Sequence, residues 1–229
     1  MQKNFVINSD NFNVYYSRDS FHEAKQISDL MEMKLKDIYE FYEIKNDKKL
    51  QGEVYLFDSL HEMKKYLDDN NIYELEHQPS YMTSCERERK LYLLTPKDKI
   101  FDDYTKDDYD RIIYHEEIHL VTELVFGYLP EWLNEGIAKY LDGTYKKGMK
   151  SLFENYINNY RIPDLEQIDG DTFVTDDYDG YDLCYVLVSY IIDVNGKDKL
   201  LNLVNNKTLI ERVSTKDLNL ALDYYRNMI

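Results

Sequence analysis

The segment that most constrains this chain is residues 112–120, which read IIYHEEIHL. It places two histidines and two glutamates inside an otherwise apolar run. On a helix, residues four apart lie on the same face, with Cβ atoms ~5–6 Å apart. His115 and His119 can therefore both direct a ring nitrogen at one ion, at the ~2.0–2.1 Å that zinc–nitrogen bonds require.

Glu116 directly follows His115 and lies one step around the expected helix. From there its carboxylate can reach a water molecule on the ion without being a ligand, as a general base must. A helix with two solvent-exposed histidines is the alternative. Against that alternative, both histidines lie among isoleucines, leucines and valines, and neutral imidazoles on a buried helix need partners. The segment predicts a metal-binding helix with Glu116 as base and no role for Glu117.

A catalytic zinc site needs a third protein ligand and a fourth position for water. Residues 129–138 (LPEWLNEGIA) predict a second helix, with its proline at the first turn. We expect the two helices to fold back on each other because the connection is short. Glu135 is the candidate third ligand, because Gly136 beside it permits close helix approach. Glu131 is a rival, although acidic residues in a first helical turn usually serve the helix dipole.

Hydrophobic periodicity predicts alternating strands and helices in the first half of the chain, then helices alone. We expect strands at 12–16, 52–57, 81–83 and 90–95, a charged turn at 85–89, and helices at 19–43, 59–67, 106–126, 130–141, 146–160, 181–194, 197–205 and 215–227. The predicted fold class is α+β. One domain, residues 1–229, would comprise an α+β lobe with a small mixed sheet (1–104) and an all-helical lobe carrying the metal site (105–229).

Charge and composition argue against several classes of binding partner. The formal charge of −16, from 44 acidic and 28 basic residues, argues against binding nucleic acid or an anionic membrane. No stretch approaches the ~18 apolar residues of a membrane span. The N-terminus MQKNFVINSD shows no signal peptide, so we expect a cytoplasmic protein. A secreted chain whose leader had been removed would look the same.

We expect a monomer. We also expect Cys85 and Cys184 to be free thiols, because they lack CxxC spacing.

HEEIH followed by WLNEGIA resembles the gluzincin zinc metallopeptidases, which carry HExxH on one helix and a glutamate ligand in a WxxEG-type segment on the next. The aminopeptidase N and leukotriene hydrolase relatives have a slightly longer spacer, and the closer similarity is to small bacterial peptidase MA-like proteins. The resemblance covers most of residues 10–205 and is strongest at 112–140. It implies a zincin-like fold with one catalytic zinc ion on His115, His119 and Glu135.

The resemblance also implies a tyrosine that stabilises the oxyanion. Residues 181–190 (YDLCYVLVSY) are similar to the family's YxxG segment, which opens a helix and carries this residue. That match selects Tyr181 as a second catalytic residue. Because Cys184 stands where glycine is usual, the register leaves Tyr178 as the alternative.

Two departures from the family's pattern concern the surroundings of the site. Lys139 lies four residues after Glu135, where some relatives have an acidic residue that interacts with a ligand histidine. The residue that orients His115 or His119 is therefore Asp182, Asn134 or another residue. The GxMEN-like segment with which exopeptidase relatives grip a free amine is absent from the sequence. This absence argues against aminopeptidase activity.

The expected function is a zinc metallopeptidase that hydrolyses a peptide or protein substrate, as an endopeptidase or with narrow specificity. Glu116 would take the water's proton and pass it to the leaving amine, and Tyr181 would bind the oxyanion. The strand at 90–95 could pair with an extended peptide if it forms an edge. Two alternatives stay open: a zincin-fold metal- or protein-binding module with little or no turnover, and a helical interaction protein without metal.

Overall fold

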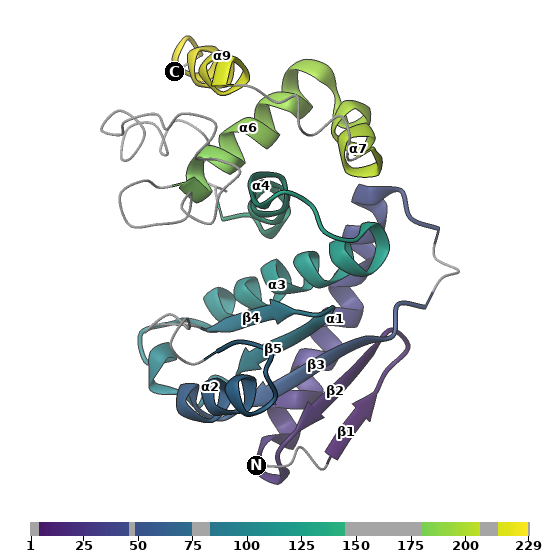
Figure 1. Ribbon diagram of the computed structural model, residues 1–229, viewed down its shortest axis with the longest axis vertical. Coiled ribbons are helices and arrows are strands. Elements are labelled where there is room, and N and C mark those ends of the chain that lie inside the picture. Colours follow the sequence, from purple (N-terminus) through teal and green to yellow (C-terminus); the bar gives the residue numbers. More distant parts are fainter. Residues whose placement is uncertain (1–4, 46–48, 75–82, 145–179, 207–214, 229) are drawn as a thin grey trace. The chain divides into compact units, whose positions relative to one another are not determined.

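The computed structural model describes residues 5–45, 49–74, 83–144, 180–206 and 215–228 (Figure 1). The chain divides into two compact units, Met1–Val125 and Phe126–Ile229. The strands are β1 (Phe5–Asn8), β2 (Phe12–Tyr16), β3 (Gly52–Phe57), β4 (Ser84–Arg87) and β5 (Lys90–Leu94). The α-helices are α1 (Phe21–Tyr42), α2 (Leu60–Asp69), α3 (Lys106–Phe126), α4 (Glu131–Asp142), α6 (Gly180–Asn195), α7 (Lys197–Asn205) and α9 (Thr215–Arg226).

The first unit contains a mixed five-stranded sheet of order β1-β2-β3-β5-β4. The central pairs, β2–β3 and β3–β5, are parallel, and the outer pairs, β1–β2 and β4–β5, are antiparallel. The registers place Val14, Val54 and Leu91 side by side, and all three are fully buried. Together with the helices of both units, this small mixed sheet confirms a mixed α+β chain, which is consistent with the zincin-like fold.

Helices cover both faces of this sheet (Figure 1). On one face, the side chain of Leu120 in α3 lies so close to Gly52 that a Cβ there would be 3.2 Å from its Cδ2. The hydroxyls of Tyr42 in α1 and Thr122 in α3 are 2.6 Å apart, which joins the two helices on that face. On the other face, the ring of Tyr66 in α2 lies 5.2 Å from the ring of Phe57.

The strand pairing corrects two expectations. Residues 84–87 form β4, where the sequence had indicated a charged turn over 85–89, because Cys85 is buried opposite Tyr92 and its pairing outweighs the flanking charge. The turn shrinks to Glu88 and Arg89, which both have positive φ. Such two-residue hairpin loops usually contain Asn or Gly, so the sequence held no signal for this one. Of the strand expected at 81–83, residues 81 and 82 lie outside the described ranges.

The second correction concerns β5. It pairs with β3 on one side and with β4 on the other, so it is not an edge and cannot add a peptide strand. In the described sheet the edges are β1, which the sequence did not predict, and β4.

The helical predictions near the motif are confirmed. α3 matches the range expected from the sequence, and Gly127 follows it with a φ of 72°. α4 begins directly after Pro130 and ends at Asp142, and Gly143 caps it with a φ of 74°. The helix expected at 146–160 lies outside the described residues. None of the helices in the described ranges is long and apolar enough to cross a membrane.

In the second unit, α4 and α6 cross in backbone contact at Gly136. A Cβ added there would come within 2.5 Å of both the Cys184 carbonyl oxygen and Cγ2 of Val188. No side chain fits such a gap, which explains a glycine in the interior of a helix.

Gly136→Ala is expected to destabilise the protein by about 1–3 kcal/mol, because the added methyl would push α4 away from α6. An alanine in place of a helical glycine usually stabilises a protein, so the sign itself is diagnostic. The measurement is urea unfolding followed by circular dichroism, with exposed Asn202→Ala in α7 as the matched helical control. An unchanged or increased stability of Gly136→Ala would contradict the close crossing.

Candidate metal centre

α3 brings the two histidines of the motif together. Their Nε2 atoms are 3.0 Å apart, and the rings meet edge to face with centroids 4.7 Å apart. Two nitrogen ligands of one tetrahedral zinc ion lie about 3.3 Å apart, given Zn–N bonds of ~2.0–2.1 Å. His119 is 6% exposed and His115 is half-buried. The pair therefore fits a metal ion that is reached from one side.

Glu116 is half-buried on α3 and lies near the edge strand β4. Burial raises the pKa of the Cys85 thiol in β4 to about 12, and the negative charge of Glu116 adds to this rise. Both cysteines are free, as expected, and the structure shows that both are buried. The carboxylate of the predicted base is thus close to the sheet edge that remains open in the described structure.

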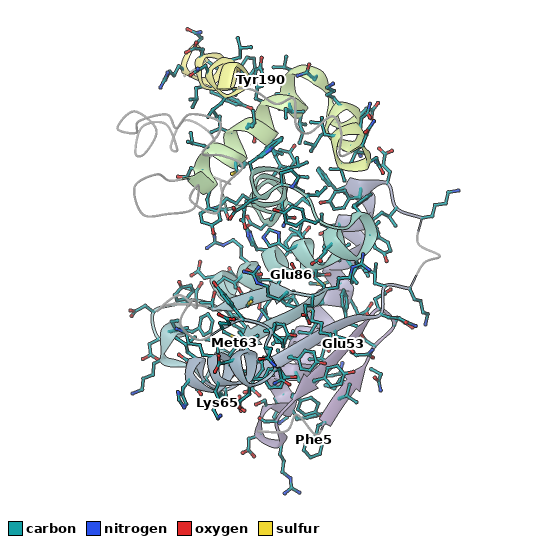
Figure 2. The ribbon with its side chains drawn as sticks, in the orientation of Figure 1. Phe5, Glu53, Met63, Lys65, Glu86 and Tyr190 are labelled. Carbon is teal, nitrogen blue, oxygen red and sulfur yellow. The ribbon has the colours of Figure 1, made fainter. Side chains whose placement is uncertain are left out.

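The carboxyl group of Glu86 in β4 also lies near Glu116 of α3. Glu86 hydrogen-bonds with Glu123 of α3, and Figure 2 shows its side chain between the sheet and that helix. Burial, this hydrogen bond and the charge of Glu123 raise the pKa of Glu86 to about 8, and the charge of Glu116 adds to the effect. Nothing in the sequence selects Glu86, because its neighbours indicate an exposed turn.

Glu117, to which the sequence assigns no role, is fully buried. Among the described residues neither of its carboxylate oxygens has a hydrogen-bond partner. Burial raises its pKa well above the ordinary value, and the charge of Glu32 in α1 acts in the same direction. Its carboxyl group faces α1, because the charged residues that influence it, which also include Lys34 and Asp37, all lie on that helix.

The remaining predicted residues lie in the second unit. Glu135 is half-buried on α4 immediately before Gly136, and Glu131 occupies the first turn of that helix. Tyr181 is the second residue of α6, next to buried Asp182. Tyr178, the alternative oxyanion donor, lies outside the described residues.

The donor atoms suit zinc. His115, His119 and Glu135 each offer one ligand atom, and such a group could hold a metal ion. Two imidazoles and one carboxylate are among the ligand sets that catalytic zinc sites use, with a fourth position for water. No other group of this kind occurs within the described ranges.

The first unit also contains a pocket of about 570 Å³ between α1 and the N-terminal half of α3. Its lining includes Ile27 and Leu30 of α1 and Tyr109 and Ile113 of α3, but neither histidine of the motif and not Glu116. The pocket is therefore separate from the two candidate histidine ligands and from Glu116.

An α+β chain with HExxH on one helix and a glutamate on the next has the features of the zincin-like metallopeptidases. The family model of the peptidase MA superfamily matches residues 103–224, more than half of the chain. The chain belongs to the peptidase MA superfamily. This membership supports a metal-dependent peptidase, and the match begins just before α3 and includes α4 and α6. A search of curated proteins finds no match.

Glu86 is expected to make stability fall as pH rises. An unfolded glutamate has a pKa of ~4.3, so between there and about 8 the folded protein holds a proton that the unfolded chain releases. The stabilisation is complete below the unfolded pKa and is lost as pH rises through the folded one. Glu86→Gln should flatten this decline in urea unfolding across that range. Glu88→Gln, in the exposed turn, is the control, and parallel curves for Glu86→Gln and wild type would refute the expectation.

Glu117→Met is expected to stabilise the protein by about 1–3 kcal/mol at neutral pH, because it replaces a buried carboxyl group that lacks a hydrogen-bond partner in the described structure. The measurement is chemical denaturation of the metal-free protein. Exposed Glu40→Met on α1 should change stability by no more than about 0.5 kcal/mol. A loss of stability in Glu117→Met would show that the carboxyl group makes a favourable interaction.

Proposed function

We propose that the protein is a zinc-dependent peptidase of the gluzincin type, in which His115, His119 and Glu135 hold one catalytic zinc ion. The observation that carries the proposal is the 3.0 Å approach of the two Nε2 atoms on α3. The superfamily match supports it, as does the short connection of four residues, 127–130, which limits how far α4 can lie from α3.

Zinc bound to these residues would polarise the scissile carbonyl and lower the pKa of a bound water toward ~7. Glu116 would accept the proton of the attacking water and then deliver it to the leaving amine. Tyr181 would donate a hydrogen bond to the substrate oxygen that gains negative charge. Burial and the neighbouring Glu123 raise the pKa of Glu86 and so favour its protonated form, which limits the negative charge beside Glu116.

The proposed substrate is an extended peptide or protein segment. β4 is the edge strand beside α3, and the charge of Glu116 reaches Cys85 in this strand. An extended chain could therefore pair with β4 while its scissile bond lies near the base. The absence of a GxMEN-like segment favours an endopeptidase or a peptidase of narrow specificity.

The alternative is a zincin-fold module that binds metal or protein without useful turnover. Buried polar groups around the motif, such as Glu117, are compatible with either function. The two proposals differ in one expectation: only the enzyme requires Glu116 for peptide cleavage.

The test combines zinc content with cleavage of a peptide library. Wild type and Glu116→Gln should each bind one zinc ion per chain, while cleavage by Glu116→Gln should fall about 10²- to 10⁴-fold. His119→Ala and Glu135→Gln should lose both zinc and activity. Glu131→Gln, which removes the rival carboxylate on the same helix, should keep both.

Four outcomes would decide against parts of this proposal. Absence of zinc from wild type after supplementation would refute the metal centre. Zinc loss in Glu131→Gln but not in Glu135→Gln would show that Glu131, and not Glu135, is the third ligand. Stoichiometric zinc with no cleavage would favour the binding module. Cleavage by Glu116→Gln equal to that by wild type would remove Glu116 from its role as base.

A further inference from the structure

Lys139 departs from the family's pattern, and the second unit shows what its side chain contacts. The Lys139 Nζ atom lies 5.2 Å from the centroid of the Tyr181 ring, which is within the ~6 Å of a cation–π interaction. The ammonium comes from α4, the helix that carries Glu135, and the ring comes from the first turn of α6. The contact therefore joins the helix of one proposed ligand to the proposed oxyanion donor.

The helix crossing fixes both partners of this contact. Gly136 leaves α4 and α6 in backbone contact opposite Cys184. Lys139 lies three residues after Gly136, and Tyr181 lies three residues before Cys184. A shift of either helix would therefore move the ammonium relative to the ring.

A buried carboxyl group also interacts with the ammonium. Asp182, next to Tyr181, is 6% exposed, and burial raises its pKa while the positive charge of Lys139 opposes that rise. The ammonium is thus attracted by the ring face and by a carboxyl group of the same helical turn. Two attractions from neighbouring residues define its position better than one.

We propose that Lys139 is a positioning residue that holds the Tyr181 ring in the orientation from which its phenol binds the substrate's oxyanion. The catalytic consequence rests on the proposed function, whereas the contact itself does not. The competing explanation is that Lys139 serves only to neutralise Asp182 and that the ring of Tyr181 is held by packing alone.

A probe on the ring separates these explanations without metal or substrate. 3-Fluorotyrosine would be incorporated at position 181 and its ¹⁹F resonance recorded in wild type, Lys139→Met and Lys139→Arg. We expect the Lys139→Met resonance to move outside the wild-type line width, and that of Lys139→Arg to stay within it, because arginine also binds aromatic faces. Lys199→Met, an exposed lysine of α7, should leave the spectrum unchanged.

An unchanged resonance in Lys139→Met, or equal changes in the methionine and arginine variants, would overturn the proposal. If the methionine variant does not fold because Asp182 loses its neighbouring charge, the double variant Lys139→Met/Asp182→Asn removes both charges. The same shift in this double variant supports positioning by Lys139, and a spectrum like that of Asp182→Asn alone overturns it.

Kinetics on the zinc-loaded protein test the catalytic consequence. Lys139→Met should lower kcat about three- to thirtyfold with little change in KM, since the interaction would act on the transition state. Lys139→Arg should restore most of the loss. In a Tyr181→Phe background, Lys139→Met should cause no further loss, and an undiminished loss there would overturn the proposal. If wild type cleaves nothing, the proposed function fails, while the ¹⁹F spectra still decide whether Lys139 positions the ring.

Discussion

The packing of α3 on the sheet is the interaction on which the rest of the first unit depends. Leu120 fills the space left by Gly52, and Thr122 is tied to Tyr42 of α1. These contacts fix the rotation of α3 about its own axis. Once that rotation is set, the helical period determines which residues are buried and which can reach a ligand. His115 and Glu116 remain half-buried, while Glu117, one step further round, is fully buried against α1.

The same packing concentrates carboxyl groups in an environment that disfavours their charge. Burial raises the pKa of Glu86 and of Glu117. The charge of Glu116 adds to the rise at Glu86, and Glu117 follows Glu116 in α3. Such arrangements reduce stability, and they cluster at functional sites because catalysis needs groups with shifted proton affinities. The carboxyl groups around HEEIH are consistent with a site that tolerates this cost.

In the second unit, the close contact between two helices determines which side chains meet. Gly136 brings α4 against α6, and Lys139 and Tyr181 meet beside that crossing. The charge of Lys139 acts on α6, through an aromatic ring and the buried carboxyl group of Asp182.

The sequence determined the helices around the motif, the spacing of His115 and His119, and the α+β class, because helical periodicity, proline and glycine are local signals. It could not determine the order of the strands, because strand neighbours depend on contacts between residues distant in sequence. In the structure β5 lies inside the sheet, and β4 is an edge strand. Nor could the sequence show that Glu117 is buried or that Glu86 meets Glu123. Charged residues look alike in a sequence, and only tertiary packing decides which of them lose water and thereby change their chemistry.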